Sequence, residues 1–132
     1  MKIVKLVCTL LILSFATTSV VAQDIPLAAL KQGIMSEFKT LPVQLDEETR
    51  MDKVEVGYNE VVYYYTLVNY TYDQVNFPIL SQALRPNILS IYCTGEAMEG
   101  FRNSNIHMLY LYYDKNGELM GTIKTNTSHC EK

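Results

Sequence analysis

The chain has 132 residues, with 11 basic and 14 acidic side chains and a formal net charge of −3 at pH 7. This length fits one small domain. The sequence has no basic run, and without clustered lysine and arginine it predicts no binding to nucleic acid or to anionic membrane surfaces. It also contains no glycine-rich phosphate loop, paired-cysteine zinc motif or activated nucleophile, so it predicts no cofactor and no metal site.

The first 22 residues have the three-part pattern of a secretory signal. Lys2 and Lys5 accompany an apolar stretch over residues 3–15, and small and polar residues follow as far as Ala22. This pattern predicts cleavage between Ala22 and Gln23 and a periplasmic or secreted product.

A retained anchor is not expected, because the apolar stretch is too short to span a bilayer. Lipidation is not expected either, because Cys8 lies inside the apolar stretch and not at the cleavage point. Removal of the two lysines changes the net charge from −3 to −5 and leaves residues 23–132 as one small domain.

Two cysteines, Cys93 and Cys130, belong to the predicted mature chain. An even pair in an exported domain predicts a disulfide, with two unrelated buried thiols as the alternative. The two histidines, His107 and His129, do not stand at zinc-ligand spacing from either cysteine. His107 is expected to be a strand residue and His129 a solvated one.

The mature chain opens with a helical pattern that Asp24 can cap and that ends at Leu41 and Pro42. Its apolar stripe consists of Leu27, Leu30, Ile34, Met35 and Phe38. Residues 41–48 read as an acidic connector. From residue 51 the period changes to two, with a turn at 57–60 and a long β-rich run over 61–70. Both faces of that run are apolar or aromatic, which predicts a central strand.

Helical spacing returns over residues 73–93, with Pro86 expected to break the helix into two pieces. The predicted packing face consists of Ile79, Leu80, Ala83 and Leu84. One short helical turn is expected within 95–102, followed by a strand over 106–113 and another over 119–125. The Asn-Gly pair at 116–117 predicts a hairpin turn between these strands. The order of elements predicts an α+β fold, an antiparallel sheet of about four strands in two hairpins with helices packed on one face.

Tyrosine is abundant, with 10 residues, while tryptophan is absent. Strand alternation places Tyr63 and Tyr65 on one face of their strand, and Tyr110 and Tyr112 together on one face of theirs. One interpretation is cross-strand aromatic packing. The other is a partner-binding surface, because tyrosine offers a large rigid ring with a polar tip.

Two acidic segments contain carboxylates that could in principle bind calcium. Residues 46–55 lack the regular oxygen spacing and the glycine of an EF-hand loop, so we expect a solvated connector. Residues 114–118 resemble half of a calcium loop, but a hairpin explains them with fewer assumptions. Asn69 and Asn126 begin glycosylation sequons, which are used only in a eukaryotic host.

The layout resembles the small α/β pilotins of bacterial type II secretion systems and a wider set of uncharacterised exported proteobacterial domains. The resemblance rests on the order of elements, the acidic segment 96–100 and the residues Asp46, Thr49, Cys93, Tyr110, Tyr112 and Cys130. Pilotins are periplasmic domains that escort the secretin subunit to the outer membrane, so the resemblance implies an accessory role with a protein partner. Pilotins of this kind are normally lipoproteins, and this chain departs from them there.

The leading hypothesis is a non-catalytic exported protein-interaction domain, with a pilotin-like accessory of a secretion system as its most concrete version. The alternative is a periplasmic immunity or inhibitor protein, because an acidic surface can block the basic cleft of a toxin or hydrolase. A third class, an enzyme with an unrecognised site, predicts that substitution of His107 abolishes an activity; we predict no enzyme. The sequence leaves the oligomeric state and the host open.

Overall fold

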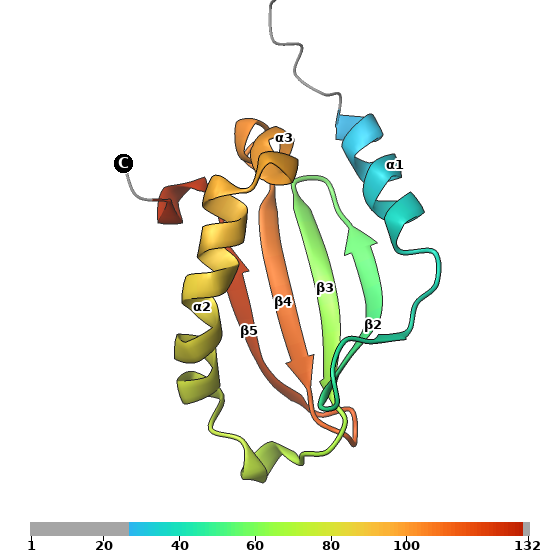
Figure 1. The fold of residues 1–132 in the computed structure, drawn as a ribbon, viewed down its shortest axis with the longest axis vertical. Helices are drawn as coiled ribbons and strands as arrows, with labels where there is room; N and C mark the ends of the chain where they lie inside the picture. The colour runs from blue at the N-terminus through green and yellow to red at the C-terminus, as the bar shows by residue number, and fades with distance from the viewer. Residues whose placement is uncertain (1–26, 131–132) are drawn as a thin grey trace, which may run out of the picture.

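The computed structural model describes residues 27–130, and the predicted signal segment with its cleavage position and Asp24 lie outside this range (Figure 1). The helices are α1 (Leu27–Glu37), α2 (Phe77–Thr94) and α3 (Glu99–Asn103), and short 3₁₀ turns cover Tyr72–Gln74, Glu96–Met98 and Thr127–His129. The strands are β1 (Val43–Gln44), β2 (Thr49–Val56), β3 (Glu60–Leu67), β4 (His107–Tyr113) and β5 (Leu119–Thr125). The predicted α+β class is confirmed.

The five strands form one sheet in the order β1-β2-β3-β4-β5. The prediction of about four strands missed β1, which forms inside the segment predicted to be a connector and pairs Val43 with Met51. The prediction of a wholly antiparallel sheet is wrong at the centre, where β3 and β4 run parallel. The crossover through α2 returns the chain to the end at which β3 began, so the next strand runs in the same direction.

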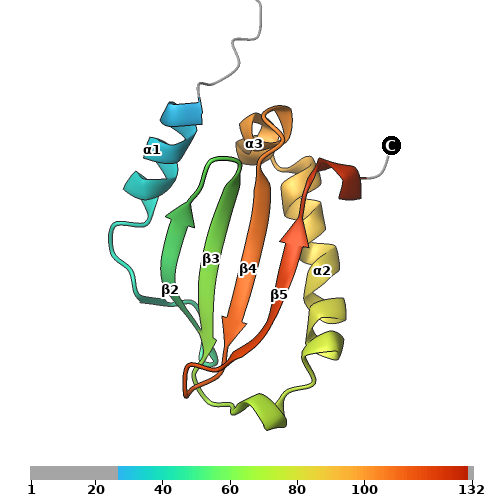
Figure 2. The same cartoon turned by 180° about the vertical axis from the view of Figure 1, so that it is seen from behind.

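Both long helices cover the same face of the sheet, as predicted. Figure 1 shows α2 in front of β5 with α1 beside β2, and Figure 2 shows the strands in front when the molecule is turned. Among residues 27–130, no helix is both long and apolar enough to cross a membrane.

α2 is one continuous helix, so the predicted break at Pro86 is wrong. Proline removes the hydrogen bond to the carbonyl of Gln82, but both residues are exposed, so water can replace the missing donor. The predicted packing face is also partly wrong. Ile79 is 64% exposed, whereas Leu80 and Leu84 pack against the core one helical turn apart.

α1 packs through fewer residues than its apolar stripe predicted. Ile34 is buried and Leu30 is half-buried, but Met35 is 55% exposed. Ile34 and Met35 are adjacent in sequence and therefore diverge by about 100° around the helix axis, so only one of them can face the sheet.

The uncovered face of the sheet carries polar and aromatic pairs that shield β3. Arg50 pairs with Asp52, and Lys53 pairs with Glu55. The Tyr64 hydroxyl donates a hydrogen bond of 2.6 Å to Glu55, which raises the pKa of Tyr64 to about 12. β3 is therefore buried along most of its length on both faces, as its sequence predicted.

The turn between β4 and β5 is built around the carboxylate of Asp114, which is 1% exposed. It accepts hydrogen bonds from the backbone N–H groups of Asn116 and Glu118 at 2.8 Å, and from that of Tyr72 at 2.9 Å. Gly117 takes a φ of 83°, which favours glycine. The hairpin prediction is confirmed, and Asp114 additionally ties the turn to the loop after β3.

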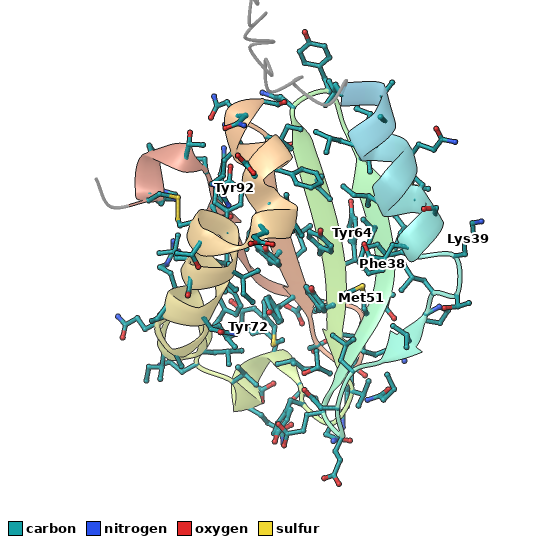
Figure 3. All side chains as sticks on the ribbon, turned by 45° about the horizontal axis from the view of Figure 1, so that its top comes forward. Phe38, Lys39, Met51, Tyr64, Tyr72 and Tyr92 are labelled. Carbon is teal, nitrogen blue, oxygen red and sulfur yellow. A yellow bond between two sulfur atoms is a disulfide. The ribbon has the colours of Figure 1, made fainter. Side chains whose placement is uncertain are left out.

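The predicted disulfide joins Cys93 near the end of α2 to Cys130. In Figure 3 the yellow bond links α2 to the C-terminal 3₁₀ turn, close to Tyr92. The Tyr92 hydroxyl donates to the carbonyl of Ile106, and Arg102 donates to the carbonyl of Tyr92. These bonds fix the C-terminal half of α2 against the sheet.

Thr125 is fully buried, and its hydroxyl is the one buried side-chain polar atom without a hydrogen-bond partner among residues 27–130. Thr125→Val keeps the shape and removes the unpaired hydroxyl, so we expect the free energy of unfolding to rise by about 1 kcal/mol. Urea unfolding followed by circular dichroism measures the change. Thr122→Val on the exposed part of the same strand is the control and should have little effect; a destabilised Thr125→Val would contradict the prediction.

Candidate functional site

Four tyrosines form a stacked array on the helix-covered face of the sheet. Rings of Tyr63 and Tyr110 stack with centroids 5.2 Å apart, and those of Tyr65 and Tyr112 with centroids 5.1 Å apart. The two pairs are joined along β3, where Tyr63 and Tyr65 lie 6.4 Å apart. We call these four residues the tyrosine tetrad. The predicted placement within each strand is confirmed, and the structure brings both pairs together.

The parallel pairing of β3 with β4 creates the tetrad. Its register places Tyr63 opposite Tyr110 and Tyr65 opposite Tyr112. In a parallel pair each residue and its neighbour point to the same face, so two alternating Tyr-x-Tyr segments in register must produce a two-by-two array. The stacking across β3 and β4 confirms the interpretation of these tyrosines as cross-strand aromatic packing. The interpretation as a partner-binding surface stays a prediction.

Two phenylalanines close the ends of the tetrad. The ring of Phe38 meets Tyr63 edge-on at 6.0 Å, and Figure 3 shows Phe38 between α1 and the sheet. At the other end the Phe77 ring lies 5.8 Å from Tyr112. Gly121 on β5 makes room for Phe77, because a Cβ atom at this position would overlap the Phe77 ring.

We expect Gly121→Ala to lower the free energy of unfolding by about 2 kcal/mol, because the added methyl group must displace the Phe77 ring from its packed position. Denaturant unfolding measures this loss. Gly33→Ala on α1 is the matched control, since a Cβ atom there meets nothing. In a Phe77→Ala background the Gly121→Ala cost should disappear; a cost that persists there would rule out the ring overlap as its cause.

The tetrad rings are mostly buried, but their hydroxyls form no hydrogen bond to another described residue. Tyr63, Tyr65 and Tyr112 are each less than 10% exposed. Burial raises the pKa of Tyr63 and of Tyr112 to about 12, and it also raises the pKa of Tyr65 and of Tyr110. At neutral pH the four hydroxyls are therefore protonated and can act as hydrogen-bond donors.

A hollow of about 550 Å³, here called the α2 hollow, lies between α2 and the tetrad. Tyr65 and Tyr112 form part of its floor, and Leu80, Leu84 and Ile88 project from α2. The segment before β2 and the loop after β3 complete it with Leu45, Asp46, Glu48, Thr49, Tyr70 and Val75. Its volume falls within the range typical of ligand sites, and its lining is mainly apolar.

A second hollow of about 380 Å³, here called the α1 hollow, lies at the other end of the tetrad. Tyr63 and Phe38 line it together with Leu30 and Ile34 of α1, and Phe101 of α3 contributes from the opposite side. Three of the four tetrad rings thus line a hollow, Tyr65 and Tyr112 on one side and Tyr63 on the other. We call the tetrad and both hollows together the tyrosine groove.

The charged residues of the tyrosine groove are all acidic. Asp46 and Glu48 line the α2 hollow, Glu37 lines the α1 hollow, and no lysine, arginine or histidine of residues 27–130 lines either. Asp46 accepts hydrogen bonds from the backbone N–H groups of Glu48 and Thr49 at 2.8 and 2.7 Å, and these bonds lower its pKa. Glu48 accepts a hydrogen bond of 2.6 Å from the Tyr70 hydroxyl. Asp46 and Glu48 are exposed, as expected for the acidic connector, but the sequence did not predict that they border a hollow, because loop carboxylates give no signal of what they face.

The remaining sequence candidates lie outside the groove. His107 begins β4, as expected, and the Nδ1 atom of His129 accepts the backbone N–H of Asn126 at 3.3 Å. Within residues 27–130, no group of three or more His, Cys, Asp or Glu side chains is placed to hold a metal ion. Asn69 is exposed, whereas the side chain of Asn126 accepts the backbone N–H of Ser128.

No protein-family model and no curated protein matches the chain. Three solved structures are similar at 12% sequence identity. A Pseudomonas aeruginosa protein described as secreted has a TM-score of 0.66 and covers 82% of this chain and 96% of its own. The pilotin of the Vibrio vulnificus type 2 secretion system has a TM-score of 0.60 and covers 80% of this chain and 91% of its own.

The type II secretion system pilotin of Vibrio cholerae has a TM-score of 0.54 and covers 78% of this chain and 90% of its own. Each of these three structures therefore has a fold similar to that of this chain over most of its length. The resemblance to pilotins that the order of elements predicted is confirmed at the level of the fold.

Proposed function

We propose that this chain is an exported, non-catalytic protein-binding domain that holds a segment of an envelope protein in the tyrosine groove. The observation that carries the proposal is the tetrad, whose mostly buried rings form a rigid floor and whose hydroxyls form no hydrogen bond to another described residue. Rigid aromatic floors of this kind are typical of binding hot spots. The fold likeness to two pilotins supports the more specific role of an accessory to a secretion system.

The position of the groove favours an amphipathic helix as the bound segment. Its floor is the face of the two central strands, so no free strand edge is available there for backbone pairing. An extended segment lying on this face would leave its own N–H and C=O groups unpaired. A helix satisfies its backbone internally and can insert apolar side chains into the hollows.

The test is capture of envelope proteins by the purified, oxidised chain, with chemical cross-linking and mass spectrometry to map the bound segment. Leu84→Lys places a charge inside the α2 hollow and should abolish capture. Ile91→Lys is the matched control, because Ile91 lies on the same helix but is 52% exposed. Circular dichroism establishes that both variants fold.

Cross-links from the groove to a helix of a secretion-system subunit would support the accessory role. A toxin or hydrolase at the same site would favour an inhibitor instead. If Leu84→Lys captures the same partners as the natural chain, the groove is not the binding site and the proposal fails.

A further inference from the structure

The tyrosine groove combines apolar walls with carboxylates that nothing in the described chain neutralises. Asp46 and Glu48 border the α2 hollow and form no ion pair within residues 27–130. The nearby basic side chains of β2 do not compensate them. Arg50 and Lys53 lie opposite Thr66 and Tyr64, on the other face of the sheet, and each already pairs with a carboxylate there.

These two carboxylates are held in place by the fold. The backbone N–H groups of Glu48 and Thr49 fix Asp46, and the Tyr70 hydroxyl fixes Glu48. Both carboxylates are therefore hydrogen-bond acceptors at a defined position beside an apolar hollow. A third acidic side chain, Glu37, lines the α1 hollow, so every charged residue among the described residues that line the groove is acidic.

We infer that the groove selects a basic segment, in which apolar side chains enter the two hollows and a lysine or arginine lies against Asp46 and Glu48. This inference rests on the proposed function and names the chemistry of its partner. Like charges brought together at an interface are costly, whereas opposite charges assist both encounter and register. We accordingly expect an acidic helix with the same apolar stripe to bind less tightly than a basic one.

The test uses three fluorescein-labelled amphipathic peptides of roughly 18 residues, about five helical turns. They share one Leu/Phe stripe and carry Lys, Gln or Glu at the polar positions. By fluorescence anisotropy with the full oxidised chain, we expect the Lys peptide to bind about tenfold more tightly than the Gln peptide, because it can form two ion pairs with the exposed carboxylates. The Glu peptide should bind most weakly, and the Lys preference should shrink when salt rises from roughly 50 to roughly 300 mM.

The variant Asp46→Asn with Glu48→Gln removes both charges but keeps an oxygen acceptor for each existing hydrogen bond. It should abolish the Lys preference, so that the Lys and Gln peptides bind with equal affinity. Glu118→Gln, an exposed carboxylate in the β4–β5 turn, is the matched control and should retain the preference.

Equal binding of the Lys and Gln peptides to the natural chain would overturn this inference, provided that Leu84→Lys still abolishes both; the proposed function would then stand. A preference that survives in the Asp46→Asn, Glu48→Gln variant also overturns it. Failure of all three peptides to bind, or binding that Leu84→Lys does not affect, would count against the groove itself and hence against both proposals.

Discussion

Replacing Cys93 and Cys130 together with alanine is expected to lower the free energy of unfolding by about 4 kcal/mol. The two cysteines are separated by 37 positions, so their bond restricts a large part of the unfolded chain. In the chain-entropy account this restriction acts on the unfolded state. The folded groove should therefore keep its shape in the variant, although fewer molecules are folded at high temperature or in denaturant.

Denaturant unfolding of the double variant measures the loss, and reduction of the natural chain with dithiothreitol is the control that should give the same shift. Peptide binding at low temperature, where the variant is still folded, should match that of the oxidised chain. Loss of binding by a folded variant would show that the disulfide positions α2, because Cys93 lies on the helix that forms one wall of the groove.

Tyr65→Ala is expected to lower the free energy of unfolding by about 3 kcal/mol, because it removes a large buried ring and leaves a cavity. Tyr65 stacks on three tetrad neighbours, Tyr63, Tyr110 and Tyr112, and is only 9% exposed. Stacking adds to the area that the ring buries. Thermal and denaturant unfolding measure the change.

Tyr65→Phe separates packing from recognition, since it removes only a hydroxyl that has no hydrogen-bond partner among the described residues. Its stability should remain close to that of the natural chain, while partner binding should weaken if the hydroxyl donates to the bound segment. Tyr64→Ala, on the opposite face of β3, is the control and should cost less because Tyr64 is half-buried. Equal losses for Tyr64→Ala and Tyr65→Ala would contradict the central role of the tetrad.

The groove depends on a few interactions that lie at its ends. Phe77 begins α2 and packs over Gly121, so the helix approaches the sheet closely at this point. Asp114 fixes the loop that leads into α2 by accepting the backbone N–H of Tyr72. Arg102 and the disulfide fix the other end of the helix. The wall of the α2 hollow is thus anchored at both ends and is suited to receive a partner without large rearrangement.

Local sequence determined most of the elements and the turn between β4 and β5. The turn between β4 and β5 needs a residue that tolerates positive φ, and the Asn-Gly pair supplies one in Gly117, whose φ is 83°. Strand alternation places Tyr63 and Tyr65 on the same face of β3, whichever strands lie beside it. The pair of cysteines in a predicted exported chain likewise indicated the disulfide that the structure contains. These features follow from interactions between residues close in sequence or from composition.

Only the tertiary structure decided how these elements meet. The pairing of β3 with β4 is parallel because a helix returns the chain across the sheet, and no local pattern encodes that choice. α2 remains continuous through Pro86 because that residue faces solvent, which depends on the side of the helix that the sheet covers. The tetrad and the acidic border of its groove arise from long-range packing, so the sequence supplied the tyrosines and carboxylates but not the surface they form together.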